Sequence, residues 1–114
     1  SVVLSLGEGF MKANEFVRKH GLNSFKAAMT CPQFARHKYA IIYRDEIDFS
    51  NELIEKHADY MFKASEIKRL VESYELVMDY YGLTRAKEHA ESNYTAPEIK
   101  DALKQAIADV ESCQ

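Results

Sequence analysis

The sequence has little proline and glycine and no tryptophan. Its 114 residues include two prolines and four glycines. An all-β sandwich needs many tight turns, and these two residue types supply most of the backbone conformations that such turns require. Their scarcity argues against that class of fold. A chain of this length is near the commonest domain size and can bury a core of its own, so we expect one domain over residues 1–114.

Cysteine is equally scarce. Cys31 and Cys113 are the two cysteines, and they do not form a C-x-x-C pair. Two cysteines are too few for the disulfide framework of a small secreted domain. We expect two free thiols in a reducing compartment and therefore a cytoplasmic protein. One disulfide between the two residues, and a signal peptide removed ahead of residue 1, are the alternatives.

The chain also lacks the motifs of membrane, metal and catalytic sites. No apolar run approaches the ~20 residues that span a bilayer. None of the four histidines has Glu three residues before it, as in di-iron bundles, and no two lie four apart, as in H-E-x-x-H sites. Gly7-Glu8-Gly9 is not followed by the Lys-Ser/Thr of a phosphate loop. We expect no membrane span, no metal or cofactor, and no enzymatic activity.

Helical periodicity is clearest between Ser65 and Tyr81. Apolar residues recur there at the spacing of one helical face, and Gly82 follows where a left-handed residue commonly ends a helix. A second apolar stripe predicts a helix over 51–64, and the sequence does not distinguish one long helix over 51–81 from two. The expected inward face of the clearest helix is Ile67, Leu70, Val71, Tyr74, Val77, Met78 and Tyr81.

Glycine and proline mark the other expected helices. A helix from about Gly7 to His20 ends at Gly21, and a short helix follows from Asn23 or Ser24 to Met29. Thr30-Cys-Pro-Gln33 and Thr95-Ala-Pro-Glu98 both match a capping box with Pro in the first helical turn. We therefore expect each Thr to begin a further helix, the second of which runs to about Val110.

The segment Tyr39–Tyr43 fits two kinds of element. Its β-branched and aromatic residues suit a strand, but the same residues also fit a helix that begins at Thr30. A lone strand would have nothing to pair with, because 44–49 reads as a loop, and we therefore favour the helix. The expected fold class is an all-α compact bundle of five to six helices, with a short strand over 39–43 as the alternative.

Charge is distributed unevenly along the chain. Residues 1–44 hold seven Lys or Arg and two Glu, a net charge of +5, whereas residues 45–114 hold eight Lys or Arg and sixteen Asp or Glu, a net charge of −8. Such asymmetry is typical of a chain with an anionic partner at one end. The alternative is that the two halves pack together and neutralise each other.

Two short segments, Gly21-Leu22-Asn23 and Gly82-Leu83-Thr84, resemble the turn of a helix-turn-helix. The helix after the second turn carries Glu88 and Glu91, which would repel the phosphates of a nucleic acid. The helix after the first turn lies among basic and aromatic residues, which can bind a phosphate backbone and stack on bases. The first turn is thus the better candidate for binding a nucleic acid.

These observations predict a small, non-enzymatic interaction or regulatory protein that acts by binding another macromolecule. Another protein is the leading partner, and a nucleic acid bound by the basic half is the alternative. A third hypothesis is an inhibitor whose acidic half mimics nucleic acid. The sequence leaves the oligomeric state open. The expected basic surface is Arg18, Lys19, Lys26, Arg36, Lys38 and Arg44, and the expected aromatic anchors are Tyr80 and Tyr81.

Overall fold

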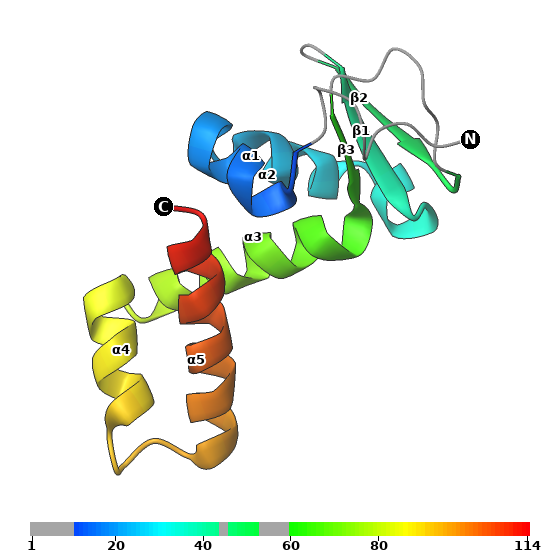
Figure 1. Ribbon diagram of the computed structural model, residues 1–114. Helices are drawn as coiled ribbons and strands as arrows, with labels where there is room; N and C mark the ends of the chain where they lie inside the picture. Colours follow the sequence, from blue (N-terminus) through cyan, green and yellow to red (C-terminus); the bar gives the residue numbers. More distant parts are fainter. Residues whose placement is uncertain (1–10, 44–45, 53–59) are drawn as a thin grey trace. The chain divides into compact units, whose positions relative to one another are not determined.

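The computed structural model describes residues 11–43, 46–52 and 60–114. These residues form five α-helices, a short 3-10 helix (η1) and a three-stranded antiparallel sheet (Figure 1), so the prediction of an all-α bundle is wrong. The chain divides inside α3 into two compact units, which we call unit 1 (up to Lys68) and unit 2 (Arg69–Gln114). The elements are α1 (Ala13–His20), α2 (Asn23–Thr30), η1 (Pro32–Arg36), β1 (Tyr39–Tyr43), β2 (Glu46–Ser50), β3 (Tyr60–Lys63), α3 (Ala64–Asp79), α4 (Leu83–Glu91) and α5 (Pro97–Ser112).

The sheet of unit 1 has β1 at its centre, with β2 and β3 on either side. Tyr39–Tyr43 is therefore a strand, and the helix favoured from sequence is wrong. The predicted loop over 44–49 and the predicted helix over 51–64 are also wrong where the structure describes them, because β2 and β3 lie there. Each edge strand supplies the backbone partners that a lone β1 would have lacked.

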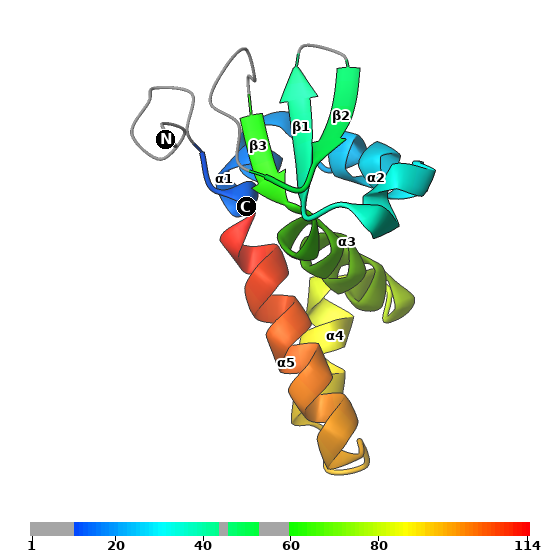
Figure 2. The same ribbon diagram turned by 90° about the vertical axis from the view of Figure 1, so that its right-hand side faces the viewer.

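Aromatic side chains join the helix pair of unit 1 to its sheet. Figures 1 and 2 show α1 and α2 on the same face of the sheet. Phe16 of α1 stacks on Phe25 of α2 with ring centroids 5.2 Å apart, and Phe62 of β3 lies edge-on to both, at 5.3 and 5.2 Å. All three residues are buried. Burying three Phe side chains contributes roughly 2–3 kcal/mol each, which makes this cluster the main anchor of the helix pair.

Unit 2 consists of the later part of α3 and the antiparallel hairpin of α4 and α5, which lie side by side (Figure 1). Small residues on α4 allow the two helices of the hairpin to approach closely, and half-buried Tyr74, Leu76, Tyr80 and Leu83 pack against the outside of the core. The buried core residues are Val77, Ala86, Ala90, Leu103, Ala106, Ile107 and Val110.

The helix predicted over 65–81 is confirmed as α3, but its last turn differs from the prediction. Ile67, Leu70, Val71 and Val77 are buried as expected, whereas Met78 and Tyr81 are 64% and 86% exposed. Sequence periodicity extended the inward face one turn too far: Met78 lies on the helix but outside its buried face, and the chain has already left the helix when it reaches Tyr81.

The backbone hydrogen bonds at the end of α3 explain why the chain leaves the helix before Tyr81. The Gly82 N–H donates to the Val77 carbonyl at 3.0 Å, and the Tyr81 N–H donates to the Met78 carbonyl at 2.9 Å. These two bonds define a Schellman motif, in which the residue at the Tyr81 position is left-handed and is usually Gly. Tyr81 indeed has φ 67°, and Gly82, predicted to take that position, is the next residue, with φ 112° and ψ 178°.

The two predicted capping boxes are also absent. The N-cap of α5 is Ala96, and no side chain there bonds to the helix end. The Thr30 hydroxyl donates instead to the Ala27 carbonyl at 2.7 Å, so it satisfies the end of α2 and does not begin a new helix. Pro32 and Pro97 do occupy the first turns of η1 and α5, because proline's missing N–H costs nothing there.

We predict opposite effects of substitution at the two positions that end α3. Tyr81→Gly should raise the free energy of unfolding by about 0.5–1 kcal/mol, because a left-handed Tyr costs more than the extra chain entropy of Gly. Gly82→Ala should lower it by about 1–3 kcal/mol, since its backbone region is accessible essentially to Gly alone. Urea unfolding followed by circular dichroism measures both, and a Tyr81→Gly variant less stable than the parent would contradict this account.

Candidate nucleic-acid interface

The structure places five of the six predicted basic residues on unit 1, all of them exposed. Arg18 and Lys19 lie in the last turn of α1, and Lys26 lies on α2. Arg36 ends η1, and Lys38 directly precedes β1. The sixth predicted residue, Arg44, lies outside the described residues. We refer to Arg18, Lys19, Lys26, Arg36 and Lys38 as the basic surface.

The basic surface lies in a stretch of chain without carboxylates. Residues 16–43 contain no Asp or Glu. The nearest acid in sequence is Glu15, whose Oε1 accepts a hydrogen bond from the Lys12 N–H at 3.4 Å in the first turn of α1. The acidic residues of unit 1 that follow this stretch, among the described residues, are Glu46 and Asp48 on β2, Glu52, and Glu66 on α3.

A short turn joins α1 to α2, as in the connection between the two helices of a helix-turn-helix. Two eight-residue helices are separated by Gly21 and Leu22, and Gly21 has φ 83°, which a residue with a side chain adopts only at a cost. Phe25 and Ala28 on the inner face of α2 are completely buried. The opposite face is exposed and consists of Asn23, Lys26, Ala27 and Thr30.

Contacts around η1 fix the backbone that carries Arg36 and Lys38. Phe49 of β2 lies against the rings of Phe34 and His37, with centroid distances of 6.4 and 6.0 Å. The Lys38 N–H donates to Oδ1 of Asn51 at 3.1 Å. Both cations thus extend from backbone held against the sheet, and their side chains are exposed.

The equivalent turn in unit 2 leads to a different surface. The helix that follows Gly82 exposes Glu88 and Glu91, as the sequence predicted. Its cations also have carboxylate partners: Nζ of Lys87 lies 2.7 Å from Glu111 Oε2, and Nε of Arg85 lies 4.0 Å from Glu88 Oε1. This helix is electrostatically unsuited to a phosphate backbone.

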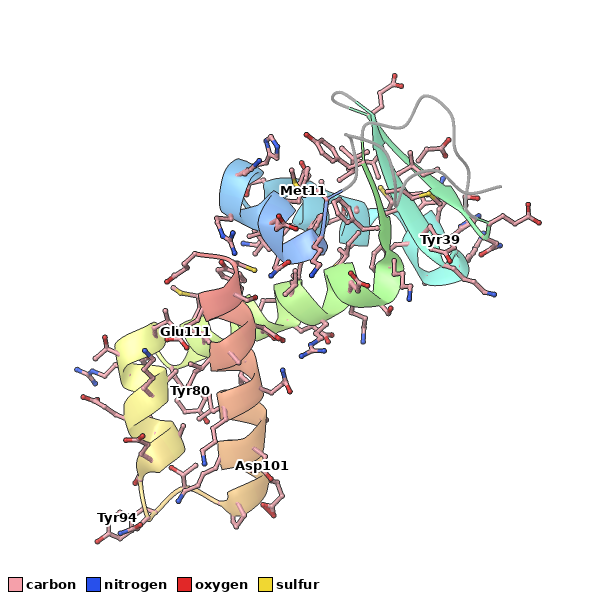
Figure 3. The ribbon with its side chains drawn as sticks, viewed as in Figure 1. Met11, Tyr39, Tyr80, Tyr94, Asp101 and Glu111 are labelled. Atoms are coloured by element: carbon pink, nitrogen blue, oxygen red, sulfur yellow. The ribbon has the colours of Figure 1, made fainter. Side chains whose placement is uncertain are left out.

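The two predicted aromatic anchors have different environments. Tyr80 is half-buried, and Figure 3 shows it between α4 and α5, with its ring 4.9 Å from that of His89. Tyr81 is 86% exposed. Both residues belong to unit 2, so neither is part of the compact unit that carries the basic surface. Tyr81 alone has the exposed ring that an anchor requires.

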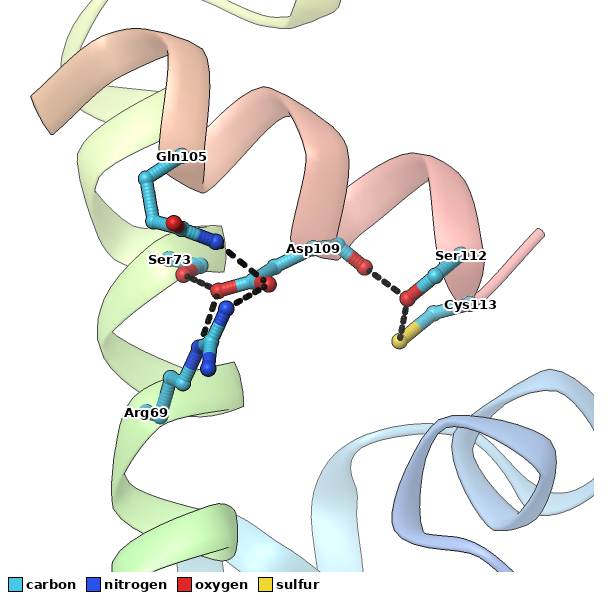
Figure 4. A network of polar contacts seen from close by, with 6 residues as sticks. All are labelled: Arg69, Ser73, Gln105, Asp109, Ser112 and Cys113. Carbon is cyan, nitrogen blue, oxygen red and sulfur yellow. Dashed lines mark hydrogen bonds and ion pairs between the residues drawn. The ribbon is translucent and has the colours of Figure 1, made fainter. Parts of the chain in front are cut away.

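Sequence reasoning missed a buried polar network on the Asp109 carboxylate (Figure 4). Arg69 donates to both carboxylate oxygens at 3.0 Å, Ser73 Oγ donates at 2.6 Å, and Gln105 Nε2 donates at 3.2 Å. Asp109 and Ser73 are buried, whereas the Arg69 side chain is 59% exposed. The sequence did contain a signal for this network: two polar pairs spaced i,i+4, which are Arg69 and Ser73 on α3 and Gln105 and Asp109 on α5. The network ties α5 to α3 and leaves no carboxylate oxygen without a donor.

A second buried contact links Tyr74 to Cys113. Burial raises the pKa of the Tyr74 phenol, and the negative charge of the neighbouring Cys113 when it is a thiolate and a hydrogen bond to Cys113 raise the pKa further. Both cysteines of the chain are free thiols, Cys113 being buried and Cys31 half-buried. Within residues 11–43, 46–52 and 60–114, no group of three or more His, Cys, Asp or Glu is arranged to hold a metal ion.

Comparisons with known proteins assign no relative. No protein-family model matches the chain, and no match was found among curated proteins or solved structures. Among the described residues, no helix is both long and apolar enough to cross a membrane. The functional interpretation therefore depends on the residues themselves.

We predict that Asp109→Asn lowers the free energy of unfolding by about 2 kcal/mol, because charge-assisted hydrogen bonds to a buried carboxylate are lost. Glu111→Gln is the matched control, since it removes the same charge from the same helix but from a half-exposed ion pair with Lys87. The control should change the free energy by less than about 0.5 kcal/mol. Equal effects of the two substitutions in urea unfolding would show that the network contributes no more than a surface pair.

We also predict that stability falls as the pH rises above about 10, the ordinary pKa of Tyr. The unfolded chain loses the Tyr74 proton at a lower pH than the folded chain, so deprotonation favours unfolding in this range. Tyr74→Phe should make the fall shallower, and Tyr94→Phe, at a residue that is 99% exposed, should not. Melting temperatures between pH 8 and 11 test this, and identical profiles for the parent and Tyr74→Phe would contradict it.

Proposed function

We propose that this chain is a non-enzymatic regulatory protein that acts by binding a nucleic acid through the basic surface of unit 1. The observation that carries the proposal is the combination of five exposed cations with a stretch, residues 16–43, that has no carboxylate. Neutralisation of phosphates by Lys and Arg supplies most of the affinity of proteins for nucleic acids that does not depend on sequence. A cytoplasmic location is part of the same proposal.

The arrangement of the cations supports this choice of partner. They extend from two helices, the end of η1 and the start of a strand, all within unit 1. Five contacts to duplex DNA would give a salt dependence with a slope of about −4.5 in log K against log salt. Their backbone is held by the buried rings of Phe16 and Phe25 and the half-buried rings of Phe34 and Phe49, which limits the entropy lost on binding.

A protein partner is the second candidate, and the end of α3 together with the residues just after it favours this partner. Met78 and Tyr81 are both large, apolar and mostly exposed there, and Tyr is enriched among residues that dominate protein interfaces. The acidic-mimic hypothesis has less support, because Asp109 and Glu111 of unit 2 are already engaged by Arg69 and Lys87.

We predict that the full chain binds a fluorescent 20-bp duplex DNA in ~50 mM salt, where electrostatic binding is strong, and loses affinity steeply as salt is added. Lys19→Glu/Lys38→Glu should weaken binding at least tenfold, because two phosphate contacts become repulsions. Lys100→Glu/Lys104→Glu, an equal change of charge on α5, should weaken it less than about threefold.

Fluorescence anisotropy measures these affinities. Absence of binding at ~50 mM salt would overturn the proposal, and so would equal losses in the two charge-reversed variants. In the second case net charge, and not the basic surface, would account for binding.

A further inference from the structure

The exposed face of α2 differs from an ordinary solvent-facing helical surface. Its residues Asn23, Lys26, Ala27 and Thr30 follow the i, i+3, i+4, i+7 spacing of one face. Three of the four side chains are short, and α2 contains no acidic residue. Short side chains allow the helix backbone to approach a partner closely, which long solvated Glu and Lys side chains would prevent.

The dimensions of α2 are compatible with the major groove of B-form DNA. Eight residues make a helix about 12 Å long, and an α-helix with its side chains has a diameter of roughly 10–12 Å. The major groove of B-form DNA is about 12 Å wide and admits such a helix, whereas the major groove of A-form RNA is too narrow for side chains to read. Phe25 and Ala28 hold the other face of α2 in the protein, so the exposed face is the one available to a groove.

Two side chains on this face have the chemistry that distinguishes bases. The structure gives no hydrogen-bond partner within the described residues for the Asn23 amide or the Lys26 ammonium, whereas the Thr30 hydroxyl already donates to the Ala27 carbonyl. An Asn amide can bond to N6 and N7 of adenine, and a Lys can bond to O6 and N7 of guanine. Ala27 and the Thr30 methyl group can contact the methyl group of thymine.

We propose that α2 enters the major groove of duplex DNA and that Asn23 and Lys26 determine which sequence is bound. This inference rests on the proposed nucleic-acid function and adds to it a substrate class and two specificity-determining residues. Lys19 and Lys38 hold the phosphates and set the affinity for any sequence, because phosphate contacts position a protein without reading bases. The helix α4 follows a similar Gly-Leu turn but exposes Glu88 and Glu91, so it has no such role.

The experiment selects sequences from a pool of duplex DNA with a random 20-bp centre, with the full chain as the capturing protein. We expect an enriched motif. The affinity of each variant is then measured for the enriched duplex and for a scrambled duplex of equal composition. The specificity ratio is the scrambled Kd divided by the enriched Kd. The chain should bind a duplex RNA with the enriched sequence no more tightly than a duplex RNA with the scrambled sequence.

The variants separate base reading from phosphate binding. Asn23→Ala should lower the specificity ratio about tenfold or more and leave binding to the scrambled duplex within twofold, because a bidentate base contact carries discrimination of this size. Lys26→Met should lower the ratio similarly. Lys19→Met, which removes the same charge from α1, should weaken both complexes equally and preserve the ratio. All three positions are exposed, and far-ultraviolet circular dichroism confirms the fold of each variant.

Each outcome has one meaning. Binding without an enriched motif, or a specificity ratio unchanged by Asn23→Ala and Lys26→Met, overturns base reading by α2 and leaves the proposed nucleic-acid function intact. Failure to bind the random duplex pool at ~50 mM salt overturns both. Preference for single-stranded or RNA probes of the enriched sequence over the DNA duplex also overturns the assignment to the major groove.

Discussion

The contact of Phe16, Phe25 and Phe62 determines what unit 1 presents to solvent. Because the three rings bury one face of α1 and α2 against β3, the opposite faces of both helices are exposed. Those exposed faces carry cations and short polar side chains and no carboxylate after Glu15. A rotation of α2 that removed Phe25 from the core would cost several kcal/mol in lost burial, so packing alone fixes which side of α2 is available to a partner.

The elements of the two units are held together by different interactions. Unit 1 joins its elements through aromatic rings, whereas unit 2 adds the polar network on Asp109 to its small apolar core. Both place a glycine of positive φ before a short helix. The two helices differ in their exposed side chains: α2 exposes Asn23 and Lys26, and α4 exposes Glu88 and Glu91. We therefore locate the proposed interface on unit 1 from surface charge and not from the turn motif itself.

Local patterns predicted α3 and the two glycine turns, because helical spacing and positive φ are local properties. The sheet was missed because strand pairing is not local. In Glu46–Ser50 apolar Ile47 and Phe49 do alternate with polar residues, which is a strand pattern, but this stretch was interpreted as a loop. The exposure of the five cations was predictable from sequence, because charged side chains are rarely buried, whereas their role as a binding surface stays a prediction. The Asp109 network was not predictable, since nothing in a helix sequence shows that an Asp is buried.

The central claim is that α1 and α2 bind nucleic acid and that α4 and α5 do not. Chemical-shift mapping tests it most directly: the isotope-labelled full chain is titrated with a 20-bp DNA duplex at ~50 mM salt. The account predicts that backbone amide signals of residues 18–38 shift, most strongly those of α2, while those of residues 83–112 stay in place. Shifts confined to residues 83–112, or no shifts at all, would contradict it.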